Sequence, residues 1–151
     1  MRLPLLDAAL SARAESDGFD TATLATDAKS LYFNGTWLAQ QLERGRPRVN
    51  RAYLHSVFHC LLRHPAKTRG RDRDLWDLAC DVAVDSILDN LDYRCLQADK
   101  PSVRRHNLYR SLRAEMPVLT AEAVHRRSLS PLLFRTFRSH VRGHSLVVSR
   151  P

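Results

Sequence analysis

The sequence predicts an α+β fold that is mostly helical and forms a single domain with a small β-hairpin near the N-terminus. Its length of 151 residues suits one domain, for which about 100–200 residues is usual. Two central segments repeat apolar residues at helical spacing, and a shorter segment before them joins β-prone residues around a turn. With 44% hydrophobic and 26% charged residues, the composition is that of a globular protein with a buried core.

The expected elements begin with a short helix and the hairpin. They are a helix at 3–14, strands at 21–26 and 30–33, and a helix at 37–44. Pro4 stands in the first turn of the first helix, where its missing N–H would have no partner in any case. Asn34 or Thr36 is the expected N-cap of the second helix, and Gly45 marks its end.

The two clearest helices lie in the middle of the chain, at 50–63 and 75–91. In the second, apolar residues are dense enough to predict a mostly buried helix. His64 and Pro65 end the first helix, because a proline disfavours helix in the residue before it. Asp74 is the expected N-cap of the second. Trp76 is expected to pack in the core, and Asp77 and Asp89 to lie on a solvated face.

The remaining expected elements are a linker at 99–104, a helix at 106–115 and a helix from 121 onward, capped by Thr120. The last helix begins just before a change in composition, since residues 123–151 hold six arginines and no acidic residue. We therefore expect a domain at 1–125 and a basic tail at 126–151.

The net charge of +8 is concentrated in that tail. A second basic stretch, 44–71, is followed by an acidic one, 72–99, which is typical of two solvated surfaces that attract each other. Nucleic-acid binding is disfavoured, because the tail offers only Phe134 and Phe137 for stacking and no recognised binding motif is present.

Membrane insertion is not expected, because no stretch approaches the roughly 18 consecutive apolar residues of a membrane span. The first ten residues do not have the pattern of a signal peptide. The three cysteines, Cys60, Cys80 and Cys95, form no CxxC pair. This sparse, odd number favours reduced thiols, and we expect a cytoplasmic protein.

The residues that point to chemistry begin with His55 and His59, four apart on an expected helix. Side chains at this spacing share one helix face, and two imidazoles so placed can bind one zinc ion. His64 is either a further ligand or a cap for the helix end. Asp81 and Asp85 are also four apart, and in an antiparallel helix pair one of them can reach the histidines.

Peptidases with a His-Glu-x-x-His helix need the glutamate, which takes a proton from the metal-bound water. The matching position here is Ser56, whose neutral hydroxyl cannot act as that base. Asp85 and Asp81 are the only nearby candidates in the sequence to replace it. A metal-free core is the other interpretation, because buried imidazoles can also be satisfied by hydrogen bonds.

Several motifs, in order, resemble one family, and the combination is far more specific than the histidine pair. They are 27–34, Trp37-Leu38, 51–55 continuing to His64, 74–85 and, more faintly, 117–122. Through them residues 20–125 resemble the bacterial metallopeptidase-like domain, zincin-like in fold, that usually precedes a von Willebrand factor A-like domain.

This resemblance implies a zincin-like fold and a zinc site formed by His55, His59 and Asp81, with His64 as an extra ligand. It also implies an AAA+ ATPase of the MoxR type and a von Willebrand factor A-like protein as partners. Ser56 departs from the family's glutamate, which argues against hydrolysis while leaving metal binding open.

We therefore expect a metal-binding homologue of metallopeptidases that is non-hydrolytic or degenerate. One alternative is a metal-free scaffold or adaptor that works with the AAA+ ATPase, in which His55 and His59 hydrogen-bond directly to the aspartates. Another is an active metallohydrolase with Asp85 or Asp81 as its base. The metal content of the purified protein separates the first two, and a water beside a carboxylate at an open ligand position would indicate the third.

Overall fold

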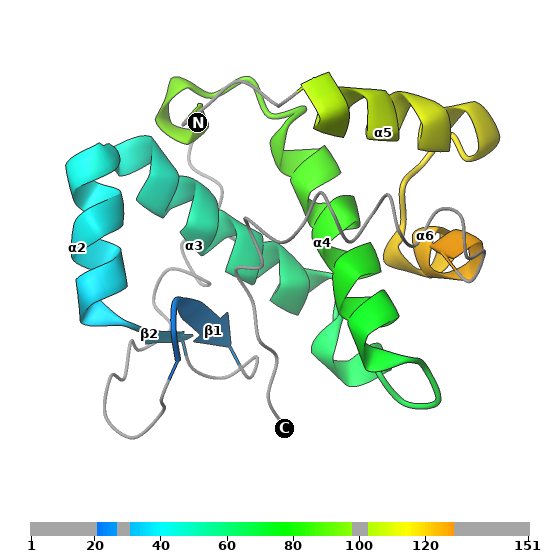
Figure 1. Cartoon of the computed structure of the whole chain (residues 1–151), viewed down its shortest axis with the longest axis horizontal. Coiled ribbons are helices and arrows are strands. Elements are labelled where there is room, and N and C mark those ends of the chain that lie inside the picture. Colours follow the sequence, from blue (N-terminus) through cyan, green and yellow to red (C-terminus); the bar gives the residue numbers. More distant parts are fainter. Residues whose placement is uncertain (1–20, 27–30, 98–102, 129–151) are drawn as a thin grey trace.

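The structure is a computed structural model that describes residues 21–26, 31–97 and 103–128; the expected helix at 3–14 and the tail beyond residue 128 lie outside these ranges (Figure 1). In chain order the elements are β1 (Leu24–Thr26), β2 (Leu31–Phe33), α2 (Gly35–Arg44), α3 (Arg46–Leu61), the short 3-10 turn η1 (Pro65–Lys67), α4 (Arg73–Leu88), the short 3-10 turn η2 (Arg94–Leu96), α5 (Val103–Glu115) and α6 (Ala121–Ser128). The expected α+β class, mostly helical with a small antiparallel sheet, is confirmed.

The hairpin is present, and its first strand is shorter than expected. β1 and β2 pair antiparallel so that Leu24 lies opposite Phe33 and Thr26 opposite Leu31. Every residue of β1 is buried, because this strand packs against α3 (Figure 1). The Thr26 hydroxyl lies 3.6 Å from the Cys60 thiol of α3, so the sheet supports the second half of that helix.

α2 and α3 follow each other almost without a break. The Asn34 side chain accepts a hydrogen bond from the backbone N–H of Trp37 and is the N-cap of α2, one of the two caps expected. Gly45 separates the helices with φ 128°, a value that residues with a Cβ rarely adopt. The expected start of α3 at residue 50 was wrong, because Pro47 lies in the first turn of the helix, where proline is favoured.

The start of α4 also differs from the expectation. Asp72, and not Asp74, is its N-cap, since the Asp72 carboxylate accepts from the Leu75 N–H at 2.9 Å. Asp74 lies in the first turn, where its negative charge interacts favourably with the helix dipole. The Thr120 cap of α6 is confirmed by its hydroxyl, which accepts from the Ala123 N–H at 3.2 Å. The helix expected from residue 106 begins three residues earlier, at Val103.

The core lies where α4, α5 and α6 meet, and α4 is at its centre. One cluster joins buried residues of the three helices and the loop before α6: Leu78, Ala79, Val82, Leu108, Tyr109, Leu112, Leu119 and Val124. A second cluster joins α4 to the start of α6: Trp76, Cys80, Ala83 and Ala121. Each large aliphatic side chain buried in this way stabilises the fold by about 1.5–3 kcal/mol. The face of α4 that remains is turned toward α3.

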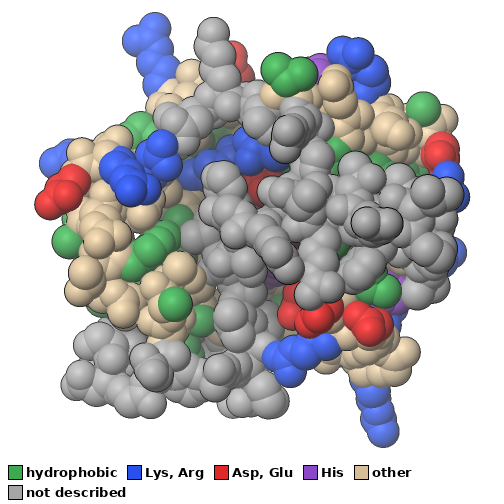
Figure 2. Space-filling view, in the orientation of Figure 1, with side chains coloured by type: hydrophobic (Ala, Val, Ile, Leu, Met, Phe, Trp, Pro, Cys, Tyr) green, Lys and Arg blue, Asp and Glu red, His purple; other side chains and the backbone are tan. Residues whose placement is uncertain are grey.

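Two features of the surface bear on function. On the described part of the face shown in Figure 2, lysine and arginine side chains lie at several separate places and do not gather into one groove. In the ranges that the structure covers, no helix is both long and apolar enough to cross a membrane.

Candidate metal centre

α3 and α4 run antiparallel where they cross, and the two histidines of α3 face the aspartates of α4. His55 contacts both Asp81 and Asp85, whereas His59, one turn later on α3, contacts Asp81. The antiparallel arrangement considered from the sequence is therefore the one observed. Both pairs are spaced by four residues, so the two histidines share one face of α3 and the two aspartates share the facing side of α4.

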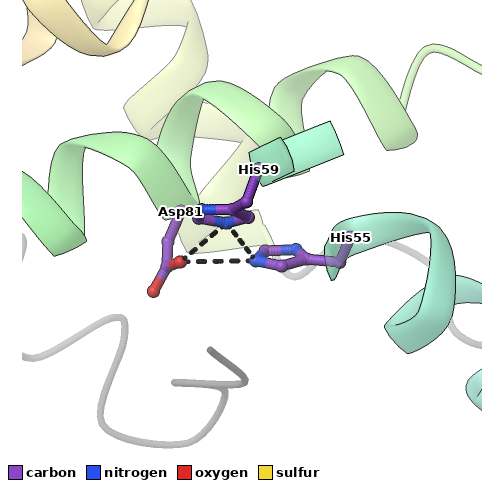
Figure 3. A group of neighbouring side chains, drawn as sticks. All are labelled: His55, His59 and Asp81. Carbon is purple, nitrogen blue, oxygen red and sulfur yellow. Dashed lines mark hydrogen bonds and ion pairs between the residues drawn. The ribbon is translucent and has the colours of Figure 1, made fainter. Parts of the chain in front are cut away.

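Three of the expected ligands form a compact triangle (Figure 3). Nε2 of His55 and Nε2 of His59 are 2.9 Å apart, and each lies 3.3 Å from Oδ1 of Asp81. The three side chains are buried, with exposed fractions of 1%, 3% and 6% in the order His55, His59, Asp81. Ligand atoms around a tetrahedral zinc with bonds of about 2.0–2.1 Å stand about 3.3 Å apart, so this group has the spacing of a metal site.

Hydrogen bonds can join these three atoms, but each placement of the hydrogens leaves one unfavourable contact. Each imidazole nitrogen carries at most one hydrogen, and an ionised carboxylate oxygen carries none. With a hydrogen on both Nε2 atoms, two donors face each other at 2.9 Å. With a hydrogen on only one, the other nitrogen and the Asp81 oxygen direct lone pairs at each other across 3.3 Å. A cation that contacts all three removes the conflict, and two nitrogens with one oxygen form a normal donor set for zinc.

The second nitrogen of His55 faces Asp85. The distance from Nδ1 to Oδ1 of Asp85 is 3.4 Å, although the geometry is not that of a hydrogen bond. Asp85 is itself held by Arg51, whose guanidinium lies 2.9 Å from the same oxygen. It therefore stands behind His55, on the side of the ring away from Asp81 and His59.

Asp85 belongs to an ion-pair network that the sequence analysis missed. Arg51 also pairs with Asp89 at 2.7 Å, and Arg105 of α5 pairs with Asp89 at 3.0 Å. Asp89, expected on a solvated face, has a side chain only 9% exposed, so that expectation was wrong. Arg51 precedes His55 by one helical turn, and Asp89 follows Asp85 by one turn. This spacing of four in both helices was the sequence feature that could have placed Arg51 and Asp89 on the facing sides of the two helices.

The histidines and arginines around Asp81 and Asp85 favour the ionised form of both carboxyl groups. Burial alone would raise the pKa of Asp81, but His55 and His59 outweigh it and hold the pKa below its usual range. Burial would likewise raise the pKa of Asp85, yet His55 and the neighbouring arginines hold it low. For His55, burial lowers the pKa while the two carboxylates raise it, with a net value of about 9. Burial lowers the pKa of His59.

The structure places His64 next to His59 but outside the triangle. α3 ends in a turn in which the His64 N–H donates to the His59 carbonyl and the Arg63 N–H donates to the Cys60 carbonyl, both at 3.0 Å. These two bonds define a Schellman motif, with Arg63 in the left-handed region at φ 56°. Nδ1 of His64 then lies 3.4 Å from Nδ1 of His59. His64 is not among the side chains whose ligand atoms converge.

Ser56 adjoins the site without taking part in it. Its side chain is 1% exposed, and its hydroxyl donates to the Ala52 carbonyl one turn back, at 3.3 Å. Of the two aspartates considered as a replacement base, Asp81 belongs to the triangle, and Asp85 pairs with Arg51 behind His55.

Comparison with known proteins gives one match. A family model described as "Putative metallopeptidase domain" matches residues 3–126, a range that contains every residue of the site and of the network behind it. No curated protein and no solved structure matches the chain.

Proposed function

Since this chain belongs to the family described as "Putative metallopeptidase domain", we propose that it is a metal-binding homologue of metallopeptidases whose ion is zinc. The ligands are His55, His59 and Asp81. The observation that carries the proposal is the triangle of their three buried ligand atoms, whose edges of 2.9, 3.3 and 3.3 Å match the spacing of ligand atoms around a zinc ion. These donors come from two different helices, so binding energy at the site adds directly to the energy of folding.

The proposed role is structural and not hydrolytic. A bound zinc ion is a Lewis acid that also cross-links its ligands. Hydrolysis further needs a base beside the metal-bound water. The base position holds Ser56, whose hydroxyl is directed back to its own helix, and Asp85 is engaged by Arg51. The geometry therefore supports a zinc that joins α3 to α4 in a zincin-like domain that has lost its general base.

The proposed partners rest on the family resemblance, and the proposed compartment rests on the free cysteines. We propose that the domain at 1–125 works with an AAA+ ATPase of the MoxR type and a von Willebrand factor A-like protein, as resembling domains do. The cysteines of the described residues are free thiols, as in a reducing cytoplasm. Co-elution of the purified chain with such an ATPase, with and without ATP, tests the partnership.

The test of the metal site is elemental analysis of protein purified without an affinity tag or chelator. We expect close to one zinc per chain in the wild type and in His106→Gln, a control that removes an exposed histidine of α5. His59→Gln and Asp81→Asn should lower the zinc content and the melting temperature together.

A well-folded wild type without metal, whose melting temperature is unchanged by added zinc, would refute the proposal. That result would instead favour the metal-free scaffold, with His55 hydrogen-bonded to Asp81. Peptide hydrolysis that disappears with the zinc would contradict the structural role while leaving the ligands in place.

A further inference from the structure

His64 is a buried histidine that the zinc site, as proposed, does not use. The residue is only 4% exposed, and its Nδ1 lies 3.4 Å from Nδ1 of His59. The rings meet edge to face, with centroids 5.0 Å apart. We propose that His64 is a positioning residue that accepts the Nδ1 hydrogen of His59 and so holds this ligand in place, and that it is not itself a metal ligand. This inference rests on the proposed zinc site.

The hydrogen count of His59 supports this role. His59 directs Nε2 at His55 and Asp81, so Nε2 must be free of hydrogen when a metal is bound there. A neutral imidazole then carries its hydrogen on Nδ1, and that N–H needs an acceptor because the ring is buried. Nδ1 of His64 is the acceptor at hand, provided that its own hydrogen is on Nε2. Metal ligands of this type are usually fixed through their second nitrogen, and the loss of that contact weakens metal binding.

The surroundings of His64 fix its place. The turn after α3 sets its backbone, and its carbonyl accepts a hydrogen bond from the Trp76 indole N–H at 3.2 Å. Its ring also meets the edge of Trp76, with centroids 5.9 Å apart. Because Trp76 is itself 1% exposed, His64 is held between a buried tryptophan and the ligand. A side chain held in this way can restrict the rotation of the His59 ring.

The two zinc ligands of α3 are thus supported differently. Behind His55 lies the carboxylate of Asp85, and behind His59 lies the imidazole of His64.

The test compares zinc affinities by competition with a chromophoric chelator in the full-length chain. His64→Leu removes the acceptor and should weaken zinc binding about 10–100-fold. His64→Gln restores an acceptor oxygen and should recover most of the affinity. The matched control is His125→Leu, which removes another buried histidine that packs against Trp76, with centroids 5.7 Å apart, and should leave zinc affinity unchanged.

A second readout separates a positioning residue from a ligand. Cobalt(II) substituted for zinc should give the same ligand-field spectrum in wild type and in His64→Leu, since the number of ligands does not change. A changed coordination number in that variant, or an unchanged zinc affinity in a folded His64→Leu protein, would overturn the proposal.

Nitrogen chemical shifts of the histidine rings keep the inference testable if a variant does not fold or the wild type binds no metal. We expect the wild type to show hydrogen on Nδ1 of His59 and on Nε2 of His64. Hydrogen on Nδ1 of His64 would refute the positioning role. A wild type without zinc but with this tautomer pair would refute the zinc site alone.

Discussion

Arg63 provides a quantitative test of how the turn after α3 is built. It is the only residue other than glycine with a positive φ in the described ranges, at 56°, and its side chain is exposed. Left-handed backbone brings the Cβ of an L-residue too close to the following carbonyl oxygen, which costs about 1–2 kcal/mol. Glycine avoids that contact but loses more freedom on folding, by about 0.5–1 kcal/mol. Arg63→Gly should therefore stabilise the protein by about 0.5–1 kcal/mol.

Urea unfolding of the chain at a fixed zinc concentration measures this difference. Arg63→Ala is the matched control, because it removes the same exposed side chain but keeps the Cβ, and it should not gain stability. Zinc affinity in Arg63→Gly should stay at the wild-type value or rise, since the turn that carries His64 is relaxed and not removed. A glycine variant that is no more stable than the alanine variant would refute the reasoning.

Three further predictions concern Asp77, Asp85 and Trp76. Burial raises the pKa of Asp77 to about 6, so this carboxyl costs stability as the pH rises from 4 to 6. Its side chain is 37% exposed, and after allowance for solvent screening Asp77→Asn should stabilise the protein by about 1 kcal/mol at pH 7, with a flatter urea-unfolding profile between pH 4 and 6. The pKa of Asp85 is held low, so its contribution is present above pH 4 and is lost in acid. Asp85→Asn leaves Arg51 with one partner fewer and should cost about 3 kcal/mol at pH 7, with weaker acid dependence below pH 4 in the same assay. Trp76→Phe leaves the His64 carbonyl without its indole donor and should cost about 2–3 kcal/mol in thermal unfolding, whereas Trp37→Phe, at a half-buried position of α2, should cost less.

The residues that converge in the site were visible in the sequence because two helices of matching period carry them. A spacing of four puts His55 and His59 on one face, and the apolar density of the next helix predicts that it is buried. Once the helices pack antiparallel, either Asp81 or Asp85 can reach the histidines, and the family resemblance was what singled out Asp81. Helix boundaries were harder to predict, since Pro47 begins a helix as readily as it interrupts one.

The environment behind the ligands could not be predicted in the same way. A left-handed Arg63 has no sequence signal, because glycine or asparagine is the usual residue at that position of the turn. Without the turn, His64 is only a histidine near a helix end. The network of Arg51 and Asp89 also depends on α5, which supplies Arg105 as a second partner of Asp89. No spacing in the sequence indicates that α5 packs beside this residue.

The position of α4 has a consequence for the cooperativity of the whole domain. One side of this helix closes the apolar core with α5 and α6, and the other side supplies Asp81 and Asp85. We therefore expect the core and the site to open together, so that the central amides of α4 exchange with solvent only through unfolding of the whole domain. We expect loss of the contacts between α3 and those aspartates to change the packing of α6, because α4 lies against both helices. Under the proposed function, the three ligands contribute to folding whether or not the domain hydrolyses peptides.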